Sequence, residues 1–449
     1  MSELKAVEAN TAVSGGDSSA RGSRWQVAGR ALRHRNFQLF FSGQLISLIG
    51  TWMQSVAQSW LVYRLTGSAL LLGSVGFASQ IPVFLFAPLG GMTADRINRR
   101  QIVISTQIAS MLLAFMLAVL TLSHRVQVWH IFVLASLLGV VNAFDIPGRQ
   151  SFLVDMVGKE DLMNAIALNS SMFNGARVLG PAIAGILVAR IGEGWCFFGN
   201  AVSYIAVIIG LFLMKVHSPA KAVMASPLEH IMEGFRFVNR TAPIRALLML
   251  LGLVSLVGMP YVVLMPIFAD KILHGGARGL GILMGATGVG ALLGALTLAF
   301  REGVKGLGRW VALCCAGFGA SLVVFAISHN FWVSVALLLP VGYCMMLQMA
   351  CSNTLIQVMV PDALRGRVMA VYSMMFMGMA PIGALLGGML ADRLGAQLTV
   401  SIGGAASVAG ALWFRFQLPK IRVEARRLIM AQAAAGGEPA EMSAQALED

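Results

Sequence analysis

Charged side chains are scarce in this chain. Asp, Glu, Lys and Arg make up 12% of its 449 residues, whereas hydrophobic residues make up 57% and the mean hydropathy is +0.77. A soluble domain of this length could not bury so much apolar surface. The composition therefore excludes an ordinary soluble protein and indicates a protein embedded in the lipid bilayer.

Strand-like alternation of apolar and polar residues is also missing, which argues against a transmembrane β-barrel. The apolar residues instead form runs of about 20 residues, the length that a helix needs to cross the bilayer core. The sequence predicts an all-α integral membrane protein with twelve transmembrane helices. They lie near residues 39–63, 69–92, 102–122, 128–148, 164–189, 195–216, 244–270, 279–300, 308–328, 331–356, 367–390 and 397–418.

Residue patterns for several kinds of chemistry are absent. The five cysteines lie in apolar spans without C-x-x-C spacing and the seven His are scattered, so we expect free thiols and no metal site. The single Gly-Lys pair, Gly158-Lys159, does not belong to a P-loop, which excludes ATP-driven transport by this chain alone. Neither G-x-S-x-G nor H-E-x-x-H occurs, so we expect no enzyme and no cofactor.

Positive charge is distributed unevenly between the two sides of the predicted spans. Most of the 33 Lys and Arg fall in the two tails and in alternate loops, and few fall in the remaining loops. Because Lys and Arg are retained on the cytoplasmic side of a membrane, we expect both termini to be cytoplasmic. The net charge of +13 then reflects orientation and contact with anionic lipid head groups, not nucleic-acid binding.

These patterns divide the chain into five segments. Residues 1–35 form an N-terminal tail, 36–216 a six-helix bundle, 217–243 a cytoplasmic linker, 244–418 a second six-helix bundle and 419–449 a C-terminal tail. We expect the N-terminal tail and the chain from about residue 428 onward to be largely disordered. Apolar residues at helical spacing from Leu228 to Val238 predict an amphipathic helix on the cytoplasmic surface, with a linker or a partner site as its role.

An internal repeat indicates that the two bundles are related. Residues 156–192 and 359–395 align without a gap, with identities that include Phe173/Phe376 and Arg190/Arg393. A repeat of this length is too long for a solenoid. It is typical of transporters built from two similar halves, which makes a pathway between the halves the first hypothesis for function.

The loop after the second predicted span carries a spaced motif, Gly91-Met-Thr-Ala-Asp95-Arg96-Ile-Asn-Arg99-Arg100. Its arginines fix this turn in the cytoplasm. A charged loop after a membrane helix would explain the arginines but not the spacing of the glycine, the aspartate and the arginines. The motif resembles the signature that joins the second and third helices of the major facilitator superfamily. Residues 35–47, 147–150, 164–169, 180–185 and 361–368 further resemble its exporter branch, which includes enterobactin exporters, macrolide efflux proteins and lysophospholipid transporters.

The resemblance implies an inner gate. Asp95 would contact the cytoplasmic start of the eleventh helix, whose unpaired N–H groups favour a carboxylate, and Arg149 is a second candidate partner. The gate residues that the resemblance implies are Gly91, Asp95, Arg96, Arg99, Arg100, Arg149, Asp362, Arg365 and Arg367.

The fifth predicted span resembles the antiporter signature of that superfamily, except that Ala184 stands where the pattern has a glycine. Gly180, Pro181 and Gly185 would let the helix bend while it stays packed. A packing seam fits these residues equally well.

Candidates for coupling are few, because no acid lies near the middle of a predicted span. Asp145, which we place at the cytoplasmic end of the fourth helix, is the best candidate for proton transfer, or else it forms an ion pair with Arg149. Asp155 is another cytoplasmic acid. Arg177, the one deep cation, binds an anionic substrate group or pairs with Asp145 or Asp155. Transport without coupling remains open.

Polar and aromatic residues mark a candidate cavity wall. In the superfamily, the first, fourth, seventh and tenth helices line the pathway. A polar side chain in such a helix needs a partner or cavity water, so interhelical hydrogen bonds are the alternative role. The candidates are Gln44, Gln54, Gln58, Asn142, Tyr261, Tyr343, Gln348 and Asn353.

Together these observations predict a monomeric secondary transporter in the bacterial inner membrane. It would export small amphipathic molecules, siderophores or drug-like compounds, by alternating access and in antiport with protons. The expected partners are the lipid bilayer, the small-molecule substrate and protons. A lysophospholipid transporter and a membrane sensor that does not transport are the alternatives.

Overall fold

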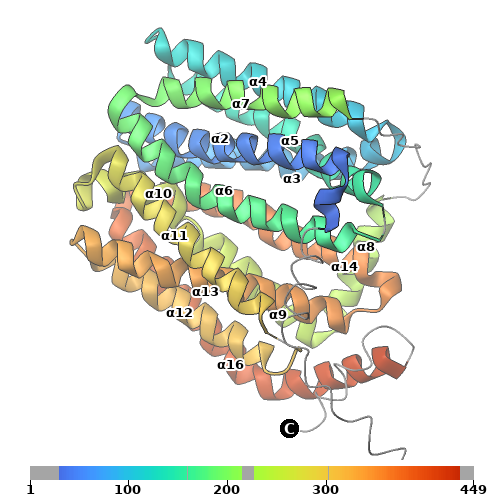
Figure 1. The fold of residues 1–449 in the computed structure, drawn as a ribbon. Coiled ribbons are helices and arrows are strands. Elements are labelled where there is room, and N and C mark those ends of the chain that lie inside the picture. Colours follow the sequence, from blue (N-terminus) through green and yellow to red (C-terminus); the bar gives the residue numbers. More distant parts are fainter. Residues whose placement is uncertain (1–29, 159, 215–226, 302, 435–449) are drawn as a thin grey trace, which may run out of the picture.

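The computed structural model describes residues 30–158, 160–214, 227–301 and 303–434, in which every regular element is a helix (Figure 1). The outer part of the predicted N-terminal tail, the last residues of the C-terminal tail and the start of the linker lie outside these ranges. A short 3₁₀ turn, η2 (Arg30–Arg33), precedes the first long helix.

The long helices form two sets that follow each other along the chain. The first set contains α2 (Arg35–Thr66), α3 (Ala69–Arg96), α4 (Arg99–Leu122), α5 (Val128–Val157), α6 (Leu162–Ile191) and α7 (Glu193–Leu213). The linker helix α8 (Pro227–Arg240) comes next. The second set contains α9 (Ala242–Leu253), η3 (Val254–Gly258), α10 (Tyr261–Ile267), η4 (Phe268–Ile272), α11 (Gly276–Ala299), α12 (Leu307–Ile327), α13 (Phe331–Met359), α14 (Asp362–Ser373), η5 (Met374–Gly378), α15 (Met379–Leu394) and α16 (Ala396–Ala434).

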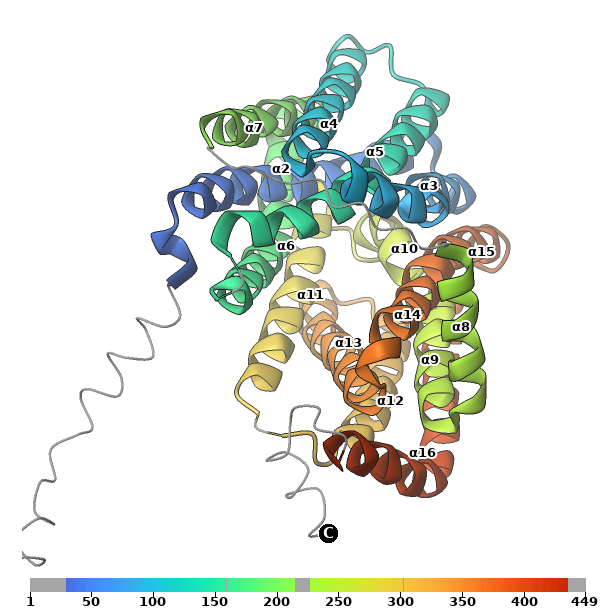
Figure 2. The same ribbon diagram turned by 90° about the vertical axis from the view of Figure 1, so that its right-hand side faces the viewer.

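Most helix contacts stay within one set. In the first set α3 packs on α5 and α7 packs on α2 and α4, whereas in the second set α12 packs on α13 and α16. The most extensive contacts between the sets are those of α6 with α11 and of α3 with α15. Figure 2, viewed along the helices, shows the two sets as separate groups that meet along these pairs.

Eleven helical segments in the described residues are long and apolar enough to cross a membrane. They correspond to every predicted span except the first, so twelve apolar spans are not confirmed. The exception is α2, whose 32 residues would easily cross a bilayer but include four Gln. Its polar residues explain the difference, because several of them face a cavity instead of lipid.

Several predicted boundaries were wrong. The helix α5 continues to Val157, beyond the predicted end at residue 148, so Asp145 lies about 18 Å before the helix end instead of at it. The helix α16 continues without a break to Ala434, although the C-terminal tail was expected to begin at residue 419. Apolar side chains explain this extension, because Ile421 is buried and Leu428 and Ile429 pack against the core of the second set.

The predicted amphipathic helix in the linker is present as α8, but it packs against α14. Val238 is buried, and a side chain at Gly234 would meet the backbone carbonyl of Arg367. Glu233 Oε2 also lies 2.6 Å from Arg367 Nη1. The linker helix is therefore attached to the start of the α14–α15 span.

Candidate functional site

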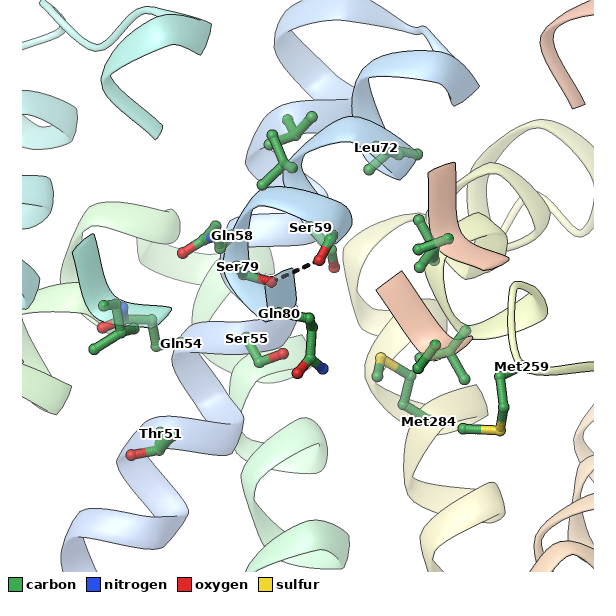
Figure 3. Close-up of a pocket in the computed structure, with 18 of the residues that line it drawn as sticks. Thr51, Gln54, Ser55, Gln58, Ser59, Leu72, Ser79, Gln80, Met259 and Met284 are labelled. Carbon is green, nitrogen blue, oxygen red and sulfur yellow. Dashed lines mark hydrogen bonds between the residues drawn. The ribbon is translucent and has the colours of Figure 1, made fainter. Parts of the chain in front are cut away.

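A cavity of about 310 Å³ lies between the two helix sets, beside the second half of α2 (Figure 3). One wall is polar and consists of side chains from α2 and α3, together with two from α7. Across the cavity lie Met259 and Met284 from the second set. Ala380 of the second set also lines the cavity. The polar lining residues are Thr51, Gln54, Ser55, Gln58, Ser59, Ser79, Gln80, Asn200 and Tyr204. This arrangement suits a molecule with one polar and one apolar side.

Hydrogen bonds to α7 fix part of the polar wall. Asn200 Nδ2 donates to Gln54 Oε1 (2.7 Å), and Ser203 Oγ lies 3.2 Å from Asn200 Oδ1. A Cβ added at Gly50 would lie 2.5 Å from Asn200 Oδ1, so this glycine lets α7 approach α2 closely. The small residue thereby positions the amide pair at the cavity.

A second cavity of about 960 Å³ lies toward the end of the molecule that carries α8, which we call the linker end. Its walls come from α3, α5 and the α14–η5 segment, and they are largely apolar. Phe84, Pro88, Ile146 and Met374 line it, whereas Asn142 adds an amide. The two helix sets are thus separated by open space at the linker end.

The opposite end, which we call the far end, is closed by contacts between the sets. Tyr63 Oη donates a hydrogen bond to Asp270 Oδ2 (2.8 Å), and Lys271 Nζ lies 5.9 Å from the centroid of the Tyr63 ring. Ser68 Oγ donates to Asp392 Oδ1 (3.3 Å). The sequence predicted no role for Tyr63, because nothing in its local pattern identifies its partner.

Glycines bring the two sets together near the far end. A Cβ added at Gly185 of α6 would lie 2.9 Å from the Cα of Gly281 in α11, and one added at Gly388 of α15 would lie 2.9 Å from the Cα of Gly73 in α3. Such separations are shorter than real Cβ atoms tolerate, so these positions need glycine for backbone contact. Of the residues proposed to bend the fifth helix, Pro181 and Gly185 therefore pack against α11, Gly180 packs against Trp52 of α2, and α6 continues through Pro181.

The gate candidates lie at the linker end, where the described ion pairs stay within one helix set or reach only α8. Arg99 Nη1 is 3.0 Å from Asp155 Oδ1, and Arg365 pairs with Asp362. Arg100 donates to the carbonyl of Leu211 (2.8 Å) at the end of α7. Arg96 is exposed and Gly91 lines the larger cavity, whereas the side chain of Asp95 lies outside the described part of the structure.

Asp145 lies in the interior of α5 and is 3% exposed, deeper than the sequence suggested. Its Oδ1 accepts hydrogen bonds from Thr106 Oγ1 (2.8 Å) and Gln107 Nε2 (2.9 Å), both on α4. Its Oδ2 is 2.9 Å from Arg149 Nη2, one helical turn away. The structure therefore shows the ion pair with Arg149 that the sequence offered as an alternative.

Of the two alternatives for Arg177, an ion pair with Asp145 or Asp155 is not among the described ion pairs, in which these acids pair with Arg149 and Arg99. The Arg177 guanidinium instead lies over Trp52, with 5.8 Å between its Cζ and the ring centroid. Tyr261 of α10 is a further neighbour of Arg177.

The predicted cavity residues separate into groups. Gln54 and Gln58 line the smaller cavity and Asn142 the larger one. Tyr343 packs against Gly290 and Gly294 of α11. The remaining candidates, Gln44, Tyr261, Gln348 and Asn353, line neither described cavity, and the first three are buried.

Sequence reasoning missed the cavity residues on α3, Ser79 and Gln80, and the three short polar residues on α2, Thr51, Ser55 and Ser59. Ser79 and Gln80 lie on a helix outside the four predicted pathway helices, and Thr51, Ser55 and Ser59 are smaller than the predicted cavity residues. The recurrence of Thr51, Gln54, Ser55, Gln58 and Ser59 at helical spacing would have identified one polar stripe.

Comparisons with known proteins agree with this architecture. A family model described as a transmembrane secretion effector matches residues 28–434. The chain is 29% identical over 393 residues to a staphyloferrin A transporter of Staphylococcus aureus, covering 86% of this chain and 97% of that protein. It is 27% identical to the multidrug efflux pump Tap of Mycolicibacterium fortuitum, covering 78% and 88% of the two chains. An enterobactin exporter of Shigella boydii is 25% identical, covering 88% and 93%.

Solved structures show the same fold. A single-residue mutant of the nucleoside transporter NupG superimposes with a TM-score of 0.68 at 14% identity, covering 86% of this chain and 99% of that one. A mutant of the peptide transporter POT, in complex with alafosfalin, also gives 0.68 at 14% identity, with 86% and 94% covered. These structures show the fold, whereas the family model and the curated relatives confirm the resemblance to the exporter branch of the major facilitator superfamily.

Proposed function

Because the chain belongs to the transmembrane secretion effector family, we propose that it is a secondary transporter that exports small amphipathic molecules by alternating access. One observation carries the proposal. The two helix sets close the pathway at the far end through Tyr63–Asp270 and Gly185–Gly281, while a large cavity separates them at the linker end. A rocking motion that reversed this pattern would carry a bound molecule across the membrane.

The orientation that we propose in the membrane rests on the placement of charge. The linker end carries the basic clusters Arg96/Arg99/Arg100 and Arg422/Arg426/Arg427, which we assign to the cytoplasmic side together with both termini. This assignment makes α2 a twelfth span and the two sets six-helix bundles. The open cavity would then collect cargo from the cytoplasm or the inner leaflet, and the chain would work as a monomer.

We assign proton coupling to Asp145. Its carboxylate is buried on a helix that lines the larger cavity, and it is held by Arg149, Thr106 and Gln107. Protonation would neutralise the carboxylate and weaken its ion pair with Arg149. Because Arg149 would then lose its partner, a change of charge at this site would alter how α5 packs on α4.

A flux assay tests the proposal. Purified protein in liposomes would be given a dye, a siderophore and a lysophospholipid under an imposed pH gradient. We expect efflux of the dye or the siderophore that depends on the gradient, and Asp145→Asn should abolish this dependence. Asp155→Asn is the matched control, because it also removes an acid paired with an arginine.

The outcomes of this assay separate the alternatives. Movement of the lysophospholipid alone would identify a lipid transporter. If the wild type transports cargo at a rate that does not depend on the pH gradient, Asp145 does not couple transport to protons, but the chain is still a transporter. Movement of none of the three cargoes would overturn the proposal and favour a membrane sensor.

A further inference from the structure

Arg177 places a positive charge near the middle of a membrane-spanning helix. It lies about 20 Å from each end of α6, so it sits close to the centre of the bilayer. A cation at this depth is costly, and proteins retain one there when a partner or a function offsets the cost.

No acid in the described residues is available to offset this charge. The elements packed on α6 are α2, α11, α7, α5 and η2, and α2, α11 and η2 contain neither Asp nor Glu. Asp145 and Asp155 on α5 pair with arginines, and Glu193 on α7 pairs with Arg64 (2.7 Å). Asp161, just before α6, pairs with His34 (2.8 Å).

The groups around Arg177 suit an anion. Trp52 presents its ring to the guanidinium and is itself held edge-on by Phe173 (5.7 Å between centroids). The hydroxyl of Tyr261 is buried and makes no hydrogen bond with a described residue. Its polar neighbour Thr287 donates to the carbonyl of Leu283 instead (3.2 Å). A guanidinium and a phenol are both hydrogen-bond donors, and neither makes a hydrogen bond of normal length and angle with a described residue, although the Thr287 hydroxyl lies close to the phenol.

Sequence neighbours of these residues line the smaller cavity, although Arg177, Trp52 and Tyr261 themselves are not among its lining residues. The neighbours Thr51 and Pro260, adjacent in sequence to Trp52 and Tyr261, line the smaller cavity. In the internal repeat Arg177 corresponds to Ala380, which also lines that cavity. In the repeat, Arg177 thus occupies the position of a residue of α15 that lines the cavity.

We propose that Arg177, Trp52 and Tyr261 bind the anionic head group of the cargo. The cargo is then an amphipathic molecule that bears a carboxylate or a phosphate and supplies the missing counter-charge. The guanidinium and the phenol donate hydrogen bonds to the oxyanion, while the indole and the methionines across the cavity contact the apolar part. This inference names the substrate class of the proposed transporter and rests on that function.

A binding experiment on the full chain, held in nanodiscs of neutral phosphatidylcholine, tests this site without requiring transport. The probes are pyrenebutyrate, pyrenebutyl phosphate and the neutral pyrenebutanol, detected by energy transfer from tryptophan. We expect Arg177→Gln to weaken binding of the preferred anionic probe about tenfold and to leave pyrenebutanol unchanged. Arg177→Lys should restore part of the affinity, and Trp52→Phe should remove part of the signal.

Two controls separate binding from structure. Arg190→Gln removes an exposed arginine from the same helix and should change the affinity for none of the probes. The melting temperature of empty Arg177→Gln should equal or exceed that of the wild type, because an uncompensated charge is removed. An equal loss for neutral and anionic probes, a lower melting temperature, or no change in anion affinity would overturn the inference.

The two anionic probes also distinguish carboxylate from phosphate, since the preferred one binds more tightly in the wild type. If the wild type binds an anionic probe through Arg177 but moves no cargo in liposomes, the proposed transport fails and the site stands. If it moves cargo but binds anions independently of Arg177, the site fails and the proposed transport stands.

Discussion

The helices α5 and α13 occupy equivalent places in the two sets, but the side chains at one equivalent buried position differ in charge and in hydrogen bonding. Asp145 lies as far from the start of α5 as Gln348 lies from the start of α13. Asp145 has two hydrogen-bond donors on α4 and an ion pair with Arg149. The side-chain amide of Gln348, also buried, makes no hydrogen bond with a described residue. The same helix arrangement therefore holds a charged hydrogen-bond network at this position in the first half and an uncharged side chain in the second half.

The same contrast separates α6 from α15. Arg177 and Pro181 on α6 correspond to Ala380 and Ala384 on α15, and both alanines line the smaller cavity. The second half contributes small residues and methionines, whereas the first half contributes charge and hydrogen bonds. The comparison suggests that the first half carries recognition and coupling, while the second supplies an apolar wall and the packing surface for closure.

The largest expected effect concerns the seam between the halves. Gly281→Ala should reduce transport more than about tenfold, because its Cβ would lie 2.6 Å from the carbonyl of Pro181 and keep the far end from closing. Gly285→Ala, one turn along α11, is the control, since its Cβ would make only an ordinary contact at 3.9 Å. Equal flux in the two variants, measured in liposomes, would show that the seam does not govern closure.

The next prediction compares the stability effects of substitutions at the equivalent positions of α5 and α13. Asp145→Leu should destabilise the protein by about 3 kcal/mol, because it leaves Arg149 without its buried partner. Gln348→Leu should be neutral or stabilising, because it replaces an amide that has no partner among the described residues. Thermal unfolding in detergent measures both. A larger loss for Gln348→Leu would reverse the assignment of the charged and uncharged halves.

A smaller effect is expected at the far end. Tyr63→Phe removes the hydrogen bond to Asp270 and should favour opening there by about 1 kcal/mol. A thiol-reactive probe at a cysteine introduced near this end would then react several times faster. Tyr343→Phe, in the second half, should not change the rate. Identical reaction rates for Tyr63→Phe and the wild type would show that Tyr63 does not help to close the far end.

The smallest effect concerns the linker helix. Glu233→Gln removes the ion pair with Arg367. Because Glu233 is half exposed, the free energy of unfolding should fall by less than about 1 kcal/mol. Hydrogen exchange in α8 should rise slightly while α5 is unaffected. A large increase across α14 would show that α8 supports the second half more strongly than this pair suggests.

Much of the fold could be predicted from the sequence, because long apolar runs and the Gly91–Arg100 motif have few structural interpretations. The helix α2 shows the limit of hydropathy: its polar residues serve a cavity and lower the average that identifies a span. The boundary near Asp145 was wrong because α5 extends beyond its apolar run as far as Val157.

The candidate site could be predicted only in part. Gln54 and Gln58 were found because a Gln in a membrane helix needs a partner or water. The Tyr63–Asp270 contact and the surroundings of Arg177 depend on how separate helices turn toward each other. One sequence gives the helices but not their mutual rotation, so such pairs become visible only in the assembled fold.

The most direct test of the central claim, alternating access between the two halves, is a pair of distance measurements by spin labelling. One pair of labels replaces Ile97 and Ala363 at the linker end, and the other replaces Arg125 and His329 at the far end; all four positions are exposed. With cargo and an imposed pH change, alternating access predicts a shorter distance between the labels at the linker end and a longer distance at the far end. Two distances that stay constant, or that change in the same direction, would contradict it.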